Sequence, residues 1–207
     1  MLFEQIPVGG MGNFAYLFAD REGGEACLVD PAHQAEKLLA RVKELKLNVT
    51  RVLLTHHHFD HLNAAMTLKA RTGAKLLAHA ETARLAAGSV SVDDHLSDGD
   101  SFILGGETVH VLHTPGHAPG SLCFVVGGQW LITGDTLFVG NCGRTDLPGG
   151  DPRQLFASLQ RLKQLPDSLV ICSGHDYGLA KTRTLGEEKK LSAVLKAATF
   201  AEFDAIP

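Results

Sequence analysis

The sequence lacks several features that would assign it to a specialised class of protein. It has no apolar run of transmembrane length, and no basic stripe of the kind that contacts nucleic acid; its formal net charge is −4 with histidine neutral. Its first residues show neither the charged nor the apolar region of a secretory signal. We therefore expect a soluble, cytoplasmic protein with no nucleic-acid partner and no membrane partner.

Cysteine is also scarce. The chain has four, at Cys27, Cys123, Cys142 and Cys172, and none of them form a Cys-x-x-Cys pair. Four in 207 residues are too few for a disulfide scaffold. Three lie in apolar, strand-like runs, which favours free, buried thiols. Cys142 lies in a polar loop and therefore stays a candidate site residue.

The apolar pattern predicts strands with interspersed helices in both halves of the chain. Expected strands cover residues 16–18, 26–29, 52–54, 75–79, 109–112, 122–126, 130–132 and 169–172. Expected helices cover residues 34–46, 61–71 with Asp60 as N-cap, a segment that begins at Asp151-Pro152, and 189–203. We expect one domain, residues 1–207, in which mixed sheets pack face to face under a cover of helices.

The most informative segment is Thr-His-His-His-Phe-Asp-His at residues 55–61, directly after an apolar run. His56 and His58 are two residues apart, so on extended backbone they point the same way and one metal ion can take both. Asp60 and His61 follow where the chain turns into a helix, and they can face a neighbouring point. The segment thus offers ligands for two adjacent metals, and paired metals are typical of hydrolases.

Three further ligand-type residues lie on loops just past expected strands: His117, Asp135 and His175. Loops at strand ends hold side chains rigidly and let them reach a cleft. Each of the three, taken singly, is also compatible with a structural role, and a Gly-Asp pair by itself marks only a turn. The clustered ligand-type residues of segment 55–61, in contrast, are not explained by a role in packing.

In this order the residues resemble the metallo-β-lactamase superfamily, whose pattern is His-x-His-x-Asp-His followed by a lone His, a lone Asp and a lone His. The resemblance covers nearly the whole chain. It implies an α/β fold, a four-layer αβ/βα sandwich of two mixed β-sheets flanked by helices, with the site at one edge between the sheets. It also implies that one metal is held by His56, His58 and His117, a second by Asp60, His61 and His175, and that Asp135 bridges the two.

Imidazoles and carboxylates suit two divalent ions, with zinc expected first and iron or manganese as alternatives. Metals roughly 3.5–4 Å apart can share one hydroxide and lower its pKa towards about 7. A metal-bound hydroxide as nucleophile, with Asp60 and Asp135 as catalytic carboxylates, would explain why the chain has no Gly-x-Ser-x-Gly elbow. Asp30 matches a family aspartate that supports the histidine loop by hydrogen bonding; an Asp-Pro turn is the alternative.

Residues 134–144 resemble glyoxalase II, which hydrolyses glutathione thioesters and uses a Cys-Gly-Arg or Cys-Gly-Lys loop to bind the peptide. The resemblance implies substrate contacts for Cys142, Arg144 and Tyr177, and a small-molecule thioester or thiol-derived substrate. A salt bridge within the loop is the alternative for Arg144, and simple packing is the alternative for Tyr177. The C-terminal helical domain of glyoxalase II has no counterpart in these residues, which leaves glutathione dependence open. A homodimer is compatible with the sequence.

Residues 142–146 together with residues 175–177 also resemble the persulfide dioxygenases. These bind a single ferrous iron through two histidines and one carboxylate, here His56, His117 and Asp135, and act on glutathione persulfide. That ligand set is the facial triad of oxygen-activating iron. The third hypothesis, a metal-binding protein without catalysis, is the weakest, because structural metal sites are closed and usually rich in cysteine.

Overall fold

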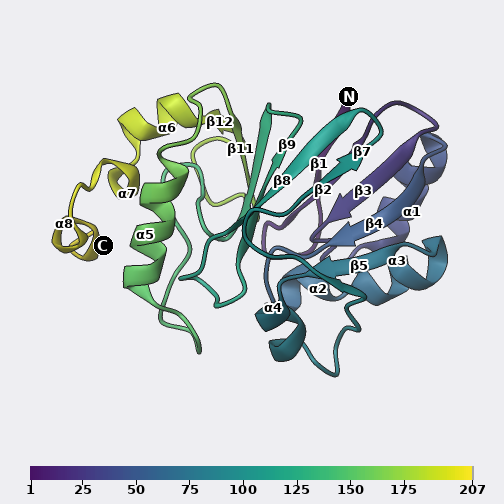
Figure 1. Cartoon of the computed structure of the whole chain (residues 1–207), viewed down its shortest axis with the longest axis horizontal. Helices are drawn as coiled ribbons and strands as arrows, with labels where there is room; N and C mark the ends of the chain where they lie inside the picture. Colours follow the sequence, from purple (N-terminus) through teal and green to yellow (C-terminus); the bar gives the residue numbers. More distant parts are fainter. Residues whose placement is uncertain (207) are drawn as a thin grey trace.

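The computed structural model describes residues 1–206 and arranges them in four layers (Figure 1). Two six-stranded sheets face each other in the middle of the molecule, and helices cover their outer faces (Figure 1). This confirms the expected fold class of two mixed sheets flanked by helices.

The first sheet combines two antiparallel pairs with three parallel ones. Pairing is antiparallel from β1 to β3 and parallel from β3 to β6. The carboxyl ends of β3, β4 and β5 therefore lie at one edge, from which the loop with residues 55–61 leaves. In spatial order the strands are β1 (Leu2–Pro7), β2 (Phe14–Ala19), β3 (Glu25–Val29), β4 (Asn48–Leu53), β5 (Lys75–Ala78) and β6 (Asp94–His95).

The second sheet is antiparallel except where β10 pairs with β11. Because β10 and β11 are parallel, the loops that follow them leave the sheet at the same edge. In spatial order the strands are β12 (Arg183–Thr184), β11 (Val170–Ser173), β10 (Trp130–Gly134), β9 (Leu122–Val126), β8 (Glu107–His113) and β7 (Ser101–Leu104).

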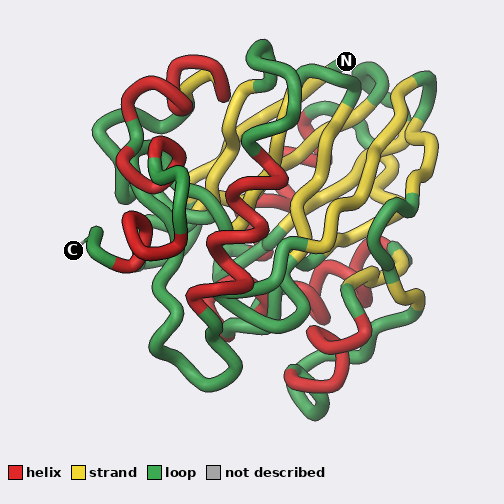
Figure 2. Tube along the Cα trace, turned by 60° about the vertical axis from the view of Figure 1, so that its left-hand side comes forward, coloured by secondary structure: helices red, strands yellow, loops and turns green. Residues whose placement is uncertain are grey.

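Helices lie on both outer faces, and Figure 2 shows one long helix of the second sheet's side in front of the strands. The helix expected from Asp151-Pro152 is present, and the Asp151 carboxylate caps it by accepting from the backbone N–H groups of Arg153 and Gln154. The helices are α1 (Ala35–Glu44), α2 (Phe59–Leu62), α3 (Ala65–Thr72), α4 (Ala80–Leu85), α5 (Pro152–Leu162), α6 (Leu185–Leu191), α7 (Ala193–Lys196) and α8 (Phe200–Asp204).

Strand β2 shows how the layers are held together. Every residue of β2 is buried. Phe14, Tyr16 and Phe18 join the core between the two sheets, whereas Ala15 and Leu17 join the core beneath α1 and α3. A strand covered on both faces reads as a continuous apolar run, which is why the sequence predicted it. The packing of β2 fixes the loop that precedes it, and that loop reaches the candidate site.

The single helix predicted over residues 61–71 is wrong, as is Asp60 as its N-cap. The segment forms α2 and α3, and the N-cap position of α2 is His58. The backbone N–H of Ala64 donates to the carbonyl of Ala32 at 2.6 Å, so a contact with a distant loop replaces a hydrogen bond within the helix. Asp60 instead lies inside α2 with its carboxylate turned to the candidate site.

The single helix predicted over residues 189–203 is also wrong, because the segment divides into α6, α7 and α8. Ser192 has an extended backbone with ψ 129°, which ends α6 before α7 begins. Thr199 begins α8 with a reciprocal capping box, in which its side chain accepts from the Glu202 N–H and Glu202 accepts in return. The Thr-x-x-Glu spacing marks this start, and the apolar periodicity obscured it.

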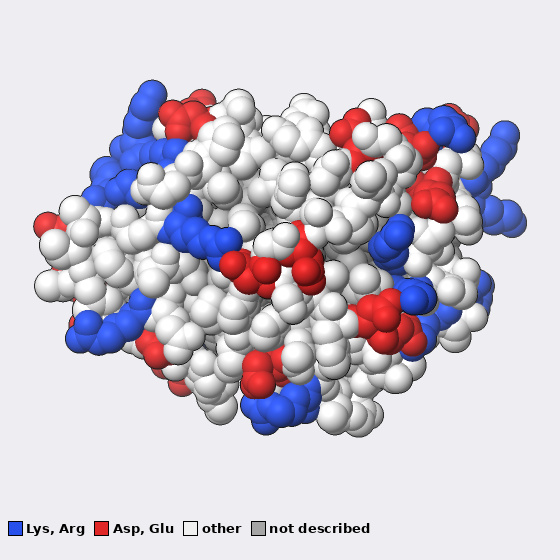
Figure 3. Space-filling view, in the orientation of Figure 1, with Lys and Arg blue, Asp and Glu red and all other residues white. Residues whose placement is uncertain are grey.

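Among residues 1–206, none of the helices combines the length and the hydrophobicity that a bilayer-spanning segment needs. On the face seen in Figure 3, basic and acidic side chains are interspersed, and no continuous basic surface covers it.

Candidate metal centre

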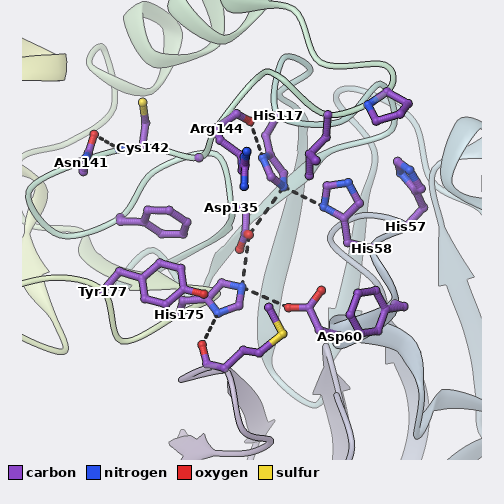
Figure 4. Close-up of a pocket in the computed structure, with 16 residues that line it drawn as sticks. His57, His58, Asp60, His117, Asp135, Asn141, Cys142, Arg144, His175 and Tyr177 are labelled. Atoms are coloured by element: carbon purple, nitrogen blue, oxygen red, sulfur yellow. Dashed lines mark hydrogen bonds and ion pairs between the residues drawn. The ribbon is translucent and has the colours of Figure 1, made fainter. Parts of the chain in front are cut away.

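The seven expected ligand-type residues meet at the edge of the molecule between the two sheets. Residues 56–61 follow β4, Asp135 follows β10 and His175 follows β11, while His117 lies in the loop between β8 and β9. Figure 4 shows the side chains of His58, His117, Asp135 and His175 turned towards one another from these separate loops. All but His58 among the seven are buried.

The first group consists of three imidazoles. His58 Nδ1 lies 3.1 Å from His56 Nε2 and 2.9 Å from His117 Nε2. The three ring nitrogens lie within 4.8 Å of one another, a spacing that could hold a metal ion. His58 thus faces two other imidazoles with the same nitrogen atom, an arrangement that one shared proton cannot satisfy.

The second group consists of Asp60, His61 and His175. The Nε2 atoms of His61 and His175 are 3.1 Å apart. Asp60 Oδ2 lies 3.5 Å from the first of these nitrogens and 3.4 Å from the second. These three atoms form another set with the spacing of a metal site.

Asp135 lies between the two groups. Its Oδ2 is 3.6 Å from His117 Nε2 and 3.3 Å from His175 Nε2, and its Oδ1 is 3.5 Å from His61 Nε2. Oδ1 is buried and has no hydrogen-bond partner among residues 1–206. A buried carboxylate oxygen without a donor is costly unless a cation faces it. One carboxylate therefore borders both sets of imidazoles.

Hydrogen bonds at Nδ1 fix the tautomer and the orientation of three of the imidazoles. His61 Nδ1 faces Asp30 Oδ2 at 2.9 Å, His117 Nδ1 faces a backbone carbonyl at 2.7 Å, and His175 Nδ1 faces another at 3.0 Å. These oxygens only accept, so Nδ1 carries the proton and Nε2 of the neutral ring offers a lone pair. Lone pairs that converge at about 3 Å repel unless a cation lies among them. The donor set therefore fits divalent ions.

Asp30 supports this arrangement from beneath. Its carboxylate accepts from Thr55 N at 2.8 Å and from the Thr55 hydroxyl at 2.5 Å, besides the bond from His61. Three donors already surround it, so we assign Asp30 a positioning role, although its oxygen lies close to His56 and His61. Its φ of 47° is left-handed, a conformation that aspartate tolerates better than most residues. These hydrogen bonds favour support over a simple Asp-Pro turn.

Burial and charge divide the two groups electrostatically. Burial lowers the pKa of His56 and His117, and lowers the pKa of His58 to about 4. Burial also acts against a charged His61, but the carboxylates of Asp135 and Asp30 outweigh it and raise the pKa of His61 well above its usual value. Burial also acts against a charged His175, but its hydrogen bond to the Asp135 carboxylate and the charge of that carboxylate together outweigh burial, so the pKa of His175 is raised. Without metal, the second group therefore binds protons more readily than the first.

Two glycines let backbone approach the centre closely. A Cβ on Gly174 would lie 2.2 Å from Asp135 Oδ1, and a Cβ on Gly143 would lie 2.0 Å from the Asp135 carbonyl oxygen. Neither distance is compatible with a side chain. These residues are glycine because of this packing, and any larger residue would displace the carboxylate or its strand end.

The expected substrate contacts line a cavity of about 620 Å³ beside the two groups. The Arg144 guanidinium pairs in bidentate fashion with Asp146, the alternative that the sequence left open, and its carbonyl is the one that orients His117. Tyr177 is 58% exposed and stacks on the His175 ring, with 4.5 Å between ring centroids. Cys142 is half-buried, and burial raises the pKa of its thiol to about 12, so the thiol is neutral.

The sequence did not identify every residue at the centre. Asn13 Nδ2 donates to Asp60 Oδ2 at 2.9 Å and to the Asp60 carbonyl at 3.3 Å. The carbonyl of Met11 accepts from His175, and the Thr55 hydroxyl lies 3.0 Å from His56 Nδ1. Thr55 adjoins the histidines and could have been found from its position. Nothing local marks Met11 or Asn13, which precede β2.

Comparison with known proteins places this geometry in context. The sequence profile described as the metallo-beta-lactamase superfamily matches residues 8–175. Hydroxyacylglutathione hydrolase GloC of Haemophilus influenzae is 34% identical, over 95% of this chain and 99% of its own. The crystal structure of ETHE1 from Myxococcus xanthus has a TM-score of 0.88 at 32% identity, covering 100% of this chain and 92% of that one. The structure of TTHA1623 in a di-iron-bound form has a TM-score of 0.80 at 34% identity, covering 91% and 98%.

Proposed function

Since the chain belongs to the metallo-β-lactamase superfamily, we propose that it is a metal-dependent hydrolase of the glyoxalase II type, which cleaves a thioester or related ester. The observation that carries the proposal is the position of Asp135 between two separate groups of metal-binding side chains. The name of the Haemophilus influenzae relative, a hydroxyacylglutathione hydrolase, supports the same reaction class.

We assign the ligands by the two groups. A dinuclear site is supported by the likeness to a protein whose structure contains two irons. Divalent ions bound here would supply Lewis acidity and lower the pKa of a coordinated water, and zinc, iron or manganese suits these donors. In this assignment His56, His58 and His117 hold one ion, Asp60, His61 and His175 hold the other, and Asp135 contacts both.

Two carboxylates of this chain are held in position at the centre. Burial would raise the pKa of Asp135, but His61 and His175 outweigh it and hold that pKa well below its usual value, so the carboxylate stays ionised and its unpartnered Oδ1 is available to a cation. Asn13 holds Asp60 Oδ2 by a hydrogen bond, which keeps that carboxylate directed at His61 and His175. The leaving group of a thioester is a thiolate, which departs without a strong general acid. The reaction therefore needs no protonated side chain beside the leaving sulfur.

The loop of residues 141–144 and Tyr177 would bind the thiol part of the substrate. Arg144 is exposed at the cavity and can exchange its contact with Asp146 for a substrate carboxylate. Tyr177 stands over His175 with its ring available to a second contact. The partner in this proposal is a small thioester or thiol-derived molecule.

A second candidate is a mononuclear iron dioxygenase that acts on glutathione persulfide. It needs only His56, His117 and Asp135 as ligands; the two histidines belong to the first group, and Asp135 borders that group through His117. The resemblance of residues 142–146 and 175–177 to the persulfide dioxygenases favours it. The two candidates differ in whether the second group is required for activity.

Metal analysis with two activity assays separates these functions. The hydrolase should contain two ions per chain and hydrolyse S-lactoylglutathione; the dioxygenase should contain one iron and consume oxygen with glutathione persulfide. His175→Ala should abolish the hydrolysis but spare most of the oxygen consumption. His110→Ala, an exposed histidine outside the centre, is the matched control. One iron per chain with no hydrolysis would refute the first proposal, and turnover of neither substrate would indicate a protein that only binds metal.

A further inference from the structure

The cavity beside the candidate metal centre has an apolar mouth. Met11 and Phe59 line this mouth, and they are 47% and 62% exposed. Single exposed apolar residues are ordinary, but two that line the same cavity offer an apolar contact surface to a ligand. This apolar mouth is a feature that the metal chemistry does not require.

Its two residues from the first half of the chain are held rigidly. The Met11 carbonyl accepts from His175 Nδ1 at 3.0 Å, and the neighbouring Gly12 carbonyl accepts from Asp176 N at 2.8 Å. Phe59 lies in α2 directly between His58 and Asp60. The residues that build the metal centre thus fix the backbone of Met11 and Phe59. A side chain on a fixed backbone binds with a small loss of conformational entropy.

The distribution of charge around the cavity also favours a substrate with one apolar end. Arg144 is the sole lysine or arginine that lines it among residues 1–206, and its guanidinium is already paired with Asp146. Figure 4 shows Arg144 and Asp60 on opposite sides of Asp135. Phe59 is next to Asp60 in α2, so its backbone lies on the Asp60 side of the centre and away from Arg144. An elongated substrate across the centre would have a polar end near Arg144 and an apolar end near Met11 and Phe59.

We infer that the acyl group of the substrate is bulky, uncharged and apolar, and that Met11 and Phe59 select it. The inference rests on the proposed thioester hydrolysis and adds the substrate class. Full burial of a methylene would raise kcat/KM about fourfold, and burial at a half-open mouth about twofold. The dependence of kcat/KM on acyl length therefore measures how far the apolar mouth buries the acyl chain.

The test uses the metal-loaded protein and a series of acetyl, butanoyl, hexanoyl and octanoyl thioesters of glutathione. We expect kcat/KM to rise about twofold per added methylene up to hexanoyl. In Phe59→Ala the hexanoyl-to-acetyl ratio of kcat/KM should fall about tenfold, and Phe59→Leu should restore most of it. Met11→Ala should lower the same ratio independently. Ile103→Ala, which removes an equally exposed apolar residue from β7, should leave the ratio unchanged.

A second measurement keeps this inference separate from the proposed reaction. S-hexylglutathione and S-methylglutathione are thioethers that cannot be hydrolysed, and calorimetry gives their affinities directly. If no thioester turns over but the hexyl ligand binds more tightly than the methyl ligand, and Phe59→Ala removes the difference, the hydrolase proposal fails and the apolar mouth stands. If turnover is normal but flat or falling with acyl length, the hydrolase stands and this inference is overturned. Equal affinities without turnover would overturn both.

Discussion

His61 connects a buried carboxylate to the candidate metal centre. Its Nδ1–H donates to Asp30 Oδ2 at 2.9 Å, and its Nε2 lies 3.1 Å from His175 Nε2. Asp30 in turn reaches this position from a left-handed backbone with φ 47°. The position of the Asp30 loop therefore fixes the orientation of the His61 ring. Asp30 thus positions a residue of the second group but is not itself a member of that group.

Replacing Asp30 should selectively weaken the binding of the ion that the second group holds. Asp30→Asn keeps the shape of the side chain but removes the negative charge that orients His61. Loss of such an outer partner lowers metal affinity by about 10- to 100-fold. Competition with a chelator measures this, and the ion of the second group should leave first. Asp94→Asn on the exposed strand β6 is the control. Unchanged affinity for both ions would show that Asp30 serves only its turn.

Asp135→Ala should abolish metal retention more completely than His58→Ala. The carboxylate of Asp135 borders both groups, whereas His58 belongs to one. Elemental analysis of the two variants after gel filtration should give close to no metal for the first and about one ion per chain for the second. Comparable losses would argue for a single metal.

Gly174→Ala should damage the centre although it adds only a methyl group. The new Cβ would lie 2.2 Å from Asp135 Oδ1, a distance at which the carboxylate must move. We expect loss of metal and activity together with a destabilisation of about 1–3 kcal/mol. Gly106→Ala is the matched control, because no atom lies within 4 Å of the added carbon. Thermal unfolding and metal content measure both effects, and a Gly174→Ala variant with full metal content would contradict the packing argument.

Metal loss on acidification should occur in two steps. The pKa values of His61 and His175 are raised in the metal-free protein, whereas those of His56 and His117 are lowered and that of His58 falls to about 4. A raised pKa means that protons compete with metal at higher pH, so affinity at the second group falls first as pH decreases. Dialysis at a series of pH values from about 7 to about 4 should release one ion before the other. Simultaneous release of both ions would contradict this order.

Local signals in the sequence predicted much of the fold and the ligand-type residues. The offsets among His56, His58 and His61 are a feature of one short segment, and Asp151-Pro152 marks a helix start by itself. Strand β2 was visible because burial on both faces leaves an unbroken apolar run.

Contacts between distant segments could not be predicted in the same way. Asn13 reaches Asp60 across 47 residues, and only the folded first sheet brings them together. The break between α2 and α3 depends on a hydrogen bond from Ala64 to Ala32, which no periodicity contains. Short edge strands such as β6 and β12 span two residues each and leave no pattern to detect.

The most direct test of the account is the number and position of metal ions in the loaded protein. Anomalous diffraction from crystals grown with zinc would locate each ion without reference to activity. We expect two ions per chain, one among His56, His58 and His117 and one among Asp60, His61 and His175, both in contact with the Asp135 carboxylate. A single ion, or a second ion away from Asp135, would contradict the dinuclear site on which the proposed hydrolysis depends.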